Sequence, residues 1–324
     1  GIKGALPIGF LTRVEEITNE RIVDHFDLIA GTSTGGIIAL GLGLGIPAAD
    51  VLSFYAEYGP TIFGSPRRSG ENAGIVRRIA DKAKDSCGRV WRSARRLVKP
   101  KYSDAVIHRA LSGVLRDRLL GDSLTRLLIP AYDADRRTVY IFKTSHHERL
   151  EVDWKRRAAD VALSTAAAPT YFPAHELPSG SRLIDGGIWA NNPTGMAVVE
   201  AVGVLGWDRT DLRVLSLGCT DEVFIPKPDG GIGHFAPTAI DLLLQGQSFA
   251  SWGTAKILAG ESNVHRINPS VPHGLFHLDD ARNVMRLAGM GAECAREALP
   301  MLRREFLIKR KEPFVPFHGS PPLT

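Results

Sequence analysis

The stretch "LIAGTSTGGIIAL", residues 28–40, joins an apolar run of strand length to a run with helical spacing through a glycine-rich turn. Its centre, "GTSTG", fits the pattern G-x-S-x-G, in which a serine sits on a sharp strand-to-helix turn. Such a turn strains the backbone of the serine, and we expect Gly31 and Gly35 to leave room for neighbouring chain. Ser33 is therefore either a nucleophile or a small residue that fills a tight turn.

The rest of the chain alternates between strand and helix patterns. Apolar runs of strand length occupy residues 26–31, 127–132, 138–143, 182–187 and 213–218. Apolar spacing typical of helices occupies residues 8–18, 35–44, 48–58, 104–115, 154–166, 194–205, 238–258 and 281–306. This alternation predicts an α/β fold with a mostly parallel central sheet flanked by helices. Such sheets place their chemistry at the carboxyl ends of strands.

Charge is concentrated in one segment of a chain that otherwise has the composition of a globular protein. Of 324 residues, 44% are hydrophobic and 23% are charged, and the net charge is +5. Residues 67–101 carry 12 Lys and Arg against 3 Asp and Glu, a local charge of +9, which leaves 28 against 32, or −4, elsewhere. The longest apolar run, residues 37–46, is well short of the roughly 20 residues that cross a bilayer.

The basic segment predicts two short amphipathic helices inserted over the main sheet. With Trp91 among its arginines, it suits an anionic membrane surface. The same charges also suit nucleic acid or nucleotide phosphates, or a solvated cap without a ligand. Because no base-stacking pattern of aromatic residues accompanies them, we expect no specific nucleic-acid partner.

A serine nucleophile needs a base and donors for the developing oxyanion. An enzyme of the Ser-His-Asp type would place its histidine late in the chain. The late candidates are His265, His273 and His277. None follows a convincing strand in a small-residue turn, whereas Asp185 in "RLIDGGIWANNP" ends an apolar strand and precedes Gly186 and Gly187. The competing interpretation is that Asp-Gly is a common turn dipeptide.

The cysteines and the start of the sequence indicate the cellular setting. The three cysteines Cys87, Cys219 and Cys294 lie far apart, without spacing for zinc or a disulfide framework. We therefore expect a reducing cytoplasm and no metal. The sequence opens on "GIKG" without Met or a signal-peptide pattern, so we expect further residues upstream.

Three blocks, "GTSTGG", "LSTAAAPTYFP" at residues 163–173 and "DGGIWANNPT" at residues 185–194, occur in this order. Over about residues 1–218 the chain resembles the patatin-like phospholipase family. The resemblance implies a patatin-like three-layer fold and hydrolysis of membrane phospholipid esters without a cofactor. It also implies a Ser-Asp dyad with Ser33 as nucleophile and Asp185 as base, and no catalytic histidine.

The family's oxyanion loop, D-G-G-G-x-[RK]-G, is matched only in part. Gly1, Lys3 and Gly4 of "GIKG" correspond to its end, and the leading D-G-G is absent. The resemblance implies that the backbone N–H groups of Gly1, Ile2 and Thr34 hold the oxyanion. Losing one such donor typically costs about 2.7–4 kcal/mol of transition-state stabilisation, so this departure puts full activity of the fragment in doubt.

The block "KYSDAVIHRAL" at residues 101–111 and the long helical region after residue 217 make the chain most similar to effector phospholipases of bacterial anti-phage systems. That resemblance implies a cytoplasmic protein, peripheral at the inner membrane face, that a cyclic dinucleotide activates. Nothing in the spacing of residues indicates a nucleotide pocket. A constitutive bacterial lipid acyl hydrolase, a Ser-His-Asp esterase and a catalytically silent membrane- or nucleotide-binding protein therefore stay open.

We expect one patatin-like domain over residues 1–312. It includes the basic helical insertion at 65–101 and a helical C-terminal extension at 230–312, and an irregular Pro-rich tail follows at 313–324. The extension suits a lid, a homo-oligomer surface or a ligand sensor, and the sequence does not choose among them.

Overall fold

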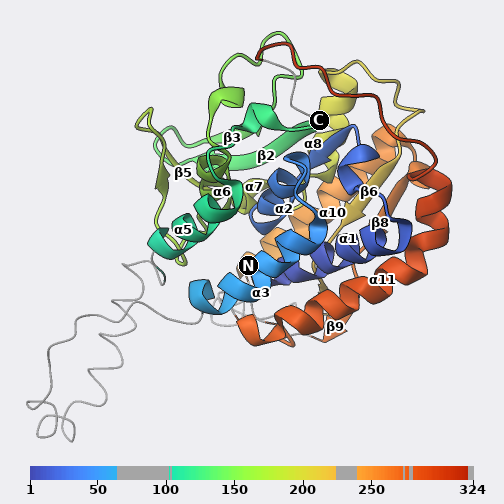
Figure 1. Ribbon diagram of the computed structural model, residues 1–324, viewed down its shortest axis with the longest axis horizontal. Coiled ribbons are helices and arrows are strands. Elements are labelled where there is room, and N and C mark those ends of the chain that lie inside the picture. The colour runs from blue at the N-terminus through green and yellow to red at the C-terminus, as the bar shows by residue number, and fades with distance from the viewer. Residues whose placement is uncertain (64–101, 103, 224–238, 273, 277–279, 320–324) are drawn as a thin grey trace, which may run out of the picture.

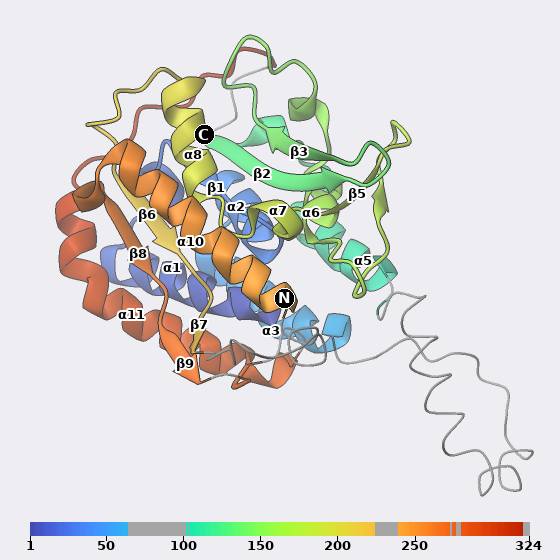
Figure 2. The same ribbon diagram turned by 180° about the vertical axis from the view of Figure 1, so that it is seen from behind.

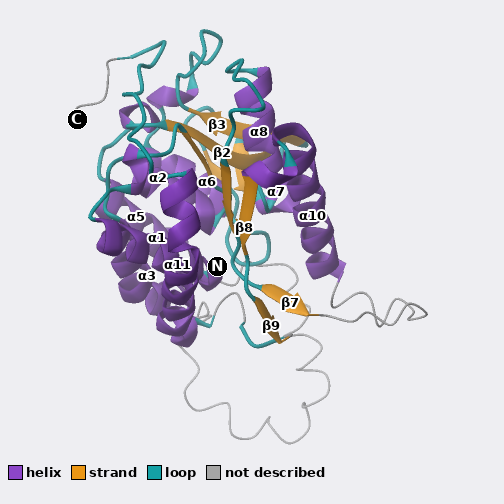
Figure 3. Cartoon of the chain, turned by 90° about the vertical axis from the view of Figure 1, so that its right-hand side faces the viewer, coloured by secondary structure: helices purple, strands orange, loops and turns teal. Residues whose placement is uncertain are grey.

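The structure is a computed structural model that describes residues 1–63, 102, 104–223, 239–272, 274–276 and 280–319. The basic insertion expected at residues 65–101 lies outside the described residues. Strands lie between two groups of helices, which gives three layers (Figure 3). One group comprises α1 (Ala5–Thr18), α2 (Thr34–Gly43), α3 (Ala48–Phe63), α5 (Asp104–Leu115), α6 (Ala158–Ala166) and α11 (Val284–Glu305). The other comprises α7 (Gly187–Ala190), α8 (Thr194–Gly203) and α10 (Ala239–Ala259).

The main sheet has five strands, and its pairing is mixed. It contains β1 (Leu28–Ala30), β2 (Arg126–Asp133), β3 (Thr138–Lys143), β4 (His175–Glu176) and β5 (Arg182–Asp185). Two further pairs are β6 (Val214–Leu217) with β8 (Val264–Ile267), and β7 (Asp221–Val223) with β9 (Ser270–Pro272). Short 3₁₀ helices are η1 (Ile2–Gly4), η2 (Ile22–Asp24), η4 (Leu120–Asp122), η5 (Asp153–Lys155), η6 (Glu261–Asn263) and η7 (Ala281–Asn283).

The expected α/β layers are present, but the main sheet is not mostly parallel. Of its pairings, β1 with β2 is parallel, whereas β2 with β3, β2 with β5 and β4 with β5 are antiparallel. The β6–β8 and β7–β9 pairs are parallel. The alternation of strands and helices predicts the layers. It does not determine whether a strand pairs parallel or antiparallel with its neighbour, so the antiparallel direction of β5 could not be predicted from it.

Strands β1 and β5 lie on the same edge of β2. The amide of Gly31 donates to the carbonyl of Leu128 at 3.1 Å, and the amide of Thr144, just after β3, donates to the carbonyl of Leu127 at 3.3 Å. Successive carbonyls of a strand point to opposite edges, so β1 lies opposite β3. Strand β5 also lies opposite β3, because both pair with residues 131–133 of β2.

The two strands run toward each other and stop before they meet. Ala30 at the end of β1 pairs with Leu128, and Asp185 at the end of β5 pairs with Ala131. Figure 2 shows β1 and β5 toward opposite ends of β2. The carboxyl ends of both strands therefore face a gap that two residues of β2, Ile129 and Pro130, span.

Pro130 occupies this gap in the middle of a strand that is buried over most of its length. Proline has no N–H to give to a neighbouring strand and is rare inside a sheet. Here the edge that faces the gap carries no strand partner at this position. The missing donor therefore costs no ladder hydrogen bond, and the carbonyl of Pro130 stays available to other groups.

Helix α1, near the start of the sequence, packs closely against α11, near its end. Most of α1 is buried, and its most extensive contact is with α11 (Figure 1). A Cβ added at Gly9 would lie 2.4 Å from the carbonyl oxygen of Ala288, and one at Gly291 would lie 2.0 Å from that of Leu6. Glycines at these two positions allow the two backbones to touch.

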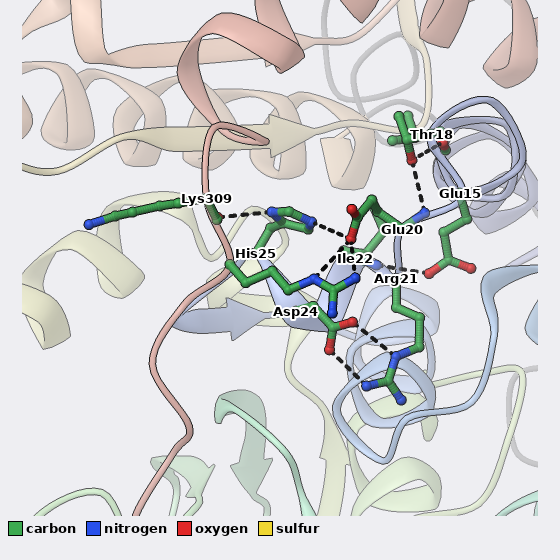
Figure 4. A network of polar contacts seen from close by, with 10 residues as sticks. Glu15, Thr18, Glu20, Arg21, Ile22, Asp24, His25 and Lys309 are labelled. Atoms are coloured by element: carbon green, nitrogen blue, oxygen red, sulfur yellow. Dashed lines mark hydrogen bonds and ion pairs between the residues drawn. The ribbon is translucent and has the colours of Figure 1, made fainter. Parts of the chain in front are cut away.

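A second set of contacts fastens the segment after α11 to the segment after α1 (Figure 4). His25 Nδ1 lies 3.0 Å from the carbonyl oxygen of Lys309, and its Nε2 lies 3.4 Å from Glu20. Glu20 also pairs with Arg310 at 2.7 Å, and the amide of Lys311 donates to the carbonyl of Asp24 at 2.8 Å. The C-terminal region thus packs directly on the N-terminal helix and its following turn.

We expect Gly291→Ala to lower the free energy of unfolding by about 1–3 kcal/mol, because its methyl group would collide with the backbone of α1. Gly289→Ala in the same helix is the matched control, since nothing lies within 4 Å of its Cβ position. That change should raise the free energy of unfolding by about 0.5–1 kcal/mol. Urea denaturation followed by circular dichroism measures both. Equal effects of the two substitutions would contradict the close contact.

Candidate active site

Ser33 occupies the turn between β1 and α2, at the side of the gap where β1 ends. Its backbone has φ 56° and ψ −125°, a left-handed conformation that is strained for a residue with a side chain. The amides of Gly36 and Ile37 donate to its carbonyl at 2.9 and 3.2 Å, which starts α2 directly after the serine. Ser33 is partly exposed, and its hydroxyl donates to Oδ2 of Asp185 at 2.5 Å.

Asp185 approaches Ser33 from the other side of the gap. Its backbone amide donates to the carbonyl of Ala167 at 3.0 Å, and its Oδ1 accepts the amide of Gly187 at 2.7 Å. The residue is only 5% exposed. Burial raises the pKa of Asp185 above its ordinary value, and the hydrogen bonds from Ser33 and Gly187 oppose that rise in part. Each carboxylate oxygen therefore has one donor, and one of these donors is the Ser33 hydroxyl.

The glycines beside these residues differ in their surroundings. A Cβ at Gly31 would lie 2.1 Å from the carbonyl oxygen of Gly35, and one at Gly186 would lie 2.3 Å from that of Pro130. These two positions therefore require glycine. At Gly35 nothing lies within 4 Å of the Cβ position, so the crowding expected there is absent. The crowded position is Gly36, where a Cβ would lie 2.7 Å from Cγ2 of Thr165.

The segment Gly1 to Gly4 packs against the first residue of α2. The nitrogen of Gly1 donates to Oγ1 of Thr34 at 2.6 Å, and that hydroxyl donates to the carbonyl of Gly1 at 3.0 Å. A Cβ at Gly4 would lie 2.0 Å from Cγ2 of Thr34, so this glycine allows the close approach. Ile2 and Thr34 begin η1 and α2, and the first N–H groups of a helix have no acceptor within it. The structure thus brings all three expected oxyanion residues beside the Ser33 turn.

Thr165 in α6 is a contact of Ser33 that the sequence did not single out. Its Oγ1 accepts the backbone N–H of Ser33 at 2.9 Å and donates to the carbonyl of Pro130 at 2.5 Å. Thr165 is fully buried. The sequence signal that could have revealed it is the proline inside an apolar strand, which marks a gap in the sheet and a carbonyl that needs another donor.

Polar side chains hold the turn that follows Asp185. The hydroxyl of Thr32 donates to the carbonyl of Ala190 at 2.6 Å, which links this turn to the Ser33 turn. The Asn192 side chain donates to the carbonyl of Ser248 at 3.2 Å and accepts the Thr194 hydroxyl at 2.5 Å. Helix α10 therefore braces the aspartate side of the site through its contacts with this turn.

The late histidines do not supply a partner for Ser33 among the described residues. His265 lies in β8, where its ring stands edge-on to Phe306 at a centroid distance of 5.7 Å. His273 and His277 lie outside the described residues. Within the described ranges, no group of three or more His, Cys, Asp or Glu side chains is arranged to hold a metal ion. No helix in the same ranges has the length and apolar character needed to cross a bilayer.

The sequence model of the family described as patatin-like phospholipase matches residues 1–198. The chain belongs to this family. The family membership, the three-layer α/β fold and the esterase class expected from the sequence are thereby confirmed. The match covers the Ser33 turn, the Thr165 helix and the Asp185 turn, whereas α10, which braces the Asp185 turn, lies beyond it.

Relatives of this patatin-like chain include bacterial and plant proteins. It is 30% identical over 286 residues to a cGAMP-activated phospholipase of Pseudomonas aeruginosa (strain BWHPSA011 / Pa011), covering 86% of this chain and 75% of that protein. A cGAMP-activated phospholipase of Vibrio cholerae is 29% identical over 247 residues, with 72% and 65% covered. Patatin-like protein 3 of Arabidopsis thaliana is 32% identical over 228 residues, 62% of this chain and about half, 49%, of that protein.

The burial of Asp185 predicts a pH-dependent cost to stability. A carboxyl whose pKa is raised on folding favours the native state only while it is protonated. Its contribution is therefore lost as pH rises from the unfolded pKa through the raised folded pKa. Asp185→Asn keeps the shape without the ionisation, so we expect it to be more stable than the wild type at pH 8, by a margin that shrinks toward pH 4.

Thermal unfolding at pH 4, 6 and 8 measures this margin. Asp208→Asn is the control, because Asp208 is exposed and hydrogen bonds from Thr210 lower its pKa. That substitution should give no gain at pH 8. A margin for Asp185→Asn that stays constant over the pH range would show that the aspartate carries no such cost.

Proposed function

We propose that this chain is a phospholipase that hydrolyses membrane phospholipid esters through a Ser33–Asp185 dyad. The observation that carries the proposal is the 2.5 Å hydrogen bond from Ser33 Oγ to Asp185 Oδ2, made between two strand ends that face each other across a gap. The raised pKa of the buried Asp185 supports its role, because a base that is less acidic than an ordinary aspartate is better matched to a serine proton.

In the first step, Ser33 Oγ attacks the ester carbonyl carbon as its proton passes to Asp185 Oδ2. The carbonyl oxygen becomes an oxyanion, which the N–H groups of Gly1, Ile2 and Thr34 would hold. The N-terminus of α2 adds a positive dipole end to this location. The carbonyl then re-forms, the alcohol of the lysophospholipid leaves with the proton from Asp185, and the acyl group stays on Ser33.

In the second step, water replaces the alcohol. It gives a proton to Asp185 as its oxygen attacks the acyl carbon, and the oxyanion donors hold the same charge again. Ser33 Oγ then leaves and takes the proton from Asp185, which releases a free fatty acid. No histidine takes part, which agrees with the direct contact between the serine and the aspartate.

A small pocket of mixed polarity lies on the Asp185 side of the dyad. Its cavity volume is about 10 Å³, roughly the space of one water molecule, and its walls include Ala166 and Ala167. The carbonyl of Ala167 accepts the amide of Asp185, so the pocket lies next to the base. The other residues in the wall are Ile107, Leu163, Phe172, Pro173 and His175. A pocket of this size does not hold an acyl chain, so the acyl substrate is proposed from the family and the dyad rather than from this pocket.

We further propose activation by a cyclic dinucleotide in anti-phage defence, with the protein acting from the cytoplasm at the inner membrane face. Two relatives named as cGAMP-activated phospholipases support this regulation. The alternative is a constitutive bacterial hydrolase. The name of the Arabidopsis thaliana relative, patatin-like protein 3, does not mention activation by cGAMP. We assign no residues of this chain to a nucleotide-binding pocket.

Free fatty acid release from mixed phospholipid vesicles tests the chemistry. We expect Ser33→Ala and Asp185→Asn to lower turnover by about 10³-fold or more, since residues that act as one unit each remove most of the rate. Ser53→Ala and Asp208→Asn are matched controls at exposed positions, and we expect both to keep wild-type turnover. Undiminished release by Asp185→Asn would exclude the dyad.

The same assay tests regulation when the wild type is measured with and without cGAMP. Activation predicts turnover that rises with the concentration of cGAMP and falls to background in its absence. Equal turnover under both conditions would favour the constitutive hydrolase. A Ser33→Ala protein should stay inactive at every cGAMP concentration.

A further inference from the structure

We infer that Thr165 is a positioning residue for the nucleophile, which holds Ser33 in its strained turn by a hydrogen-bond relay to β2. This role rests on the proposed function of Ser33. The relay runs from the Ser33 backbone N–H to Thr165 Oγ1 at 2.9 Å, and from Thr165 Oγ1 to the carbonyl of Pro130 at 2.5 Å.

The direction of both hydrogen bonds follows from chemistry. A backbone nitrogen only donates and a carbonyl only accepts, and a hydroxyl has a single hydrogen with two lone pairs. The hydroxyl of Thr165 must therefore accept from Ser33 and donate to Pro130. The buried hydroxyl thus both accepts and donates a hydrogen bond within the protein, so it needs no water molecule as a partner.

The relay depends on the gap between the facing strands. The Pro130 carbonyl points to the edge that β1 and β5 leave open, so no strand amide occupies it. Thr165 fills this role from α6 and anchors the Ser33 turn to the centre of the sheet. Because Ser33 has φ 56°, a hydrogen bond to its own backbone acts directly on the strained residue.

The relay also determines the hydrogen-bond partner of the Ser33 backbone N–H, which is Thr165 Oγ1. A donor that points into Thr165 cannot at the same time point to a substrate oxyanion. Of the donors proposed for the oxyanion, Ile2 and Thr34 are free of this contact, and the Gly1 nitrogen donates to Thr34 Oγ1. Thr165 thus fixes where the nucleophile lies without touching the substrate.

Thr165 also packs through its methyl group, which is a separate contribution. A Cβ at Gly36 would lie 2.7 Å from Cγ2 of Thr165, so the methyl sits against the first turn of α2. Thr165→Val keeps the branched shape and removes the hydroxyl. Thr165→Ser keeps the hydroxyl and removes the methyl. The two variants separate positioning by the relay from packing.

Thr125→Val is the matched control. Thr125 is also fully buried, and its hydroxyl donates to the carbonyl of Phe26 at 2.6 Å. The substitution removes the same chemical group and leaves the same kind of carbonyl without its donor. It touches neither Ser33 nor Asp185, so a loss shared by both valine variants reports stability alone.

The test measures kcat and KM for p-nitrophenyl butyrate in the presence of cGAMP, the rate at which a fluorophosphonate labels Ser33, and the midpoint of thermal unfolding. We expect Thr165→Val to lower kcat and the labelling rate about 10–100-fold with little change in KM, because a small misplacement of a reacting group costs rates of this order. Thr165→Ser should stay within about 3-fold of the wild type, and Thr125→Val should match the wild type in both rates.

The role is overturned if Thr165→Val keeps kcat and labelling near the wild-type values, or if Thr125→Val loses as much. If Thr165→Val does not fold, Thr165→Cys replaces it, since a thiol is a weak donor and acceptor and predicts the same direction of loss. A wild type that neither turns over nor labels at Ser33 would overturn the proposed function and this role together. An active, labelled wild type beside an unimpaired Thr165→Val would overturn this role alone.

Discussion

The candidate site depends on the way in which β1 and β5 approach each other along one edge of β2. In a parallel sheet, the carboxyl ends of neighbouring strands lie side by side. Here the two ends face each other across a gap, so their separation is set by how many residues of β2 lie between them. Three steps along β2 separate the partners of Ala30 and Asp185, roughly 10 Å at the usual rise of a strand. The side chains of Ser33 and Asp185 close that distance from opposite directions.

This arrangement places several unfavourable features in a small volume. Ser33 has a left-handed backbone, Asp185 is a buried carboxyl with a raised pKa, and Pro130 interrupts the donors of β2. Each is offset by a neighbour: Thr165 holds the Ser33 amide, Gly187 donates to Asp185, and the gap spares Pro130 a ladder partner. Strain and burial of this kind concentrate where structure serves chemistry rather than stability.

Much of the fold could be predicted from the sequence because its elements are long and strongly periodic. Helices α1, α2, α3, α5, α8, α10 and α11 lie close to the expected ranges. Strands β4, β7, β8 and β9, of two to four residues each, were not predicted. Strands β1, β5 and β6 are as short, but each lies in an apolar run that ends in glycine. The antiparallel direction of β5 depends on pairing with distant residues, which local spacing does not encode.

The candidate site divides in the same way. Ser33 and Asp185 stood out because each follows an apolar run and lies in a glycine-containing turn, and the structure places their side chains in contact. Thr165 lies inside a helical pattern of small residues, where a threonine gives no signal of its own. The reason expected for Gly35 was wrong, because crowding depends on which neighbour approaches and falls on Gly36. The catalytic roles and the domain limits stay predictions.

The contact between α1 and α11 joins a segment that is synthesised early to one that is synthesised late. Helix α1 follows directly on the Gly1 to Gly4 segment, and α11 touches both α1 and η1. A growing chain therefore carries the Ser33 turn and the Asp185 turn long before the helix that packs against the proposed oxyanion segment has been made. Domains complete their packing only when all their parts have left the ribosome. A nascent chain of this protein is thus an unfinished hydrolase until α11 emerges, which separates the synthesis of both site turns from the packing that supports the Gly1 to Gly4 segment.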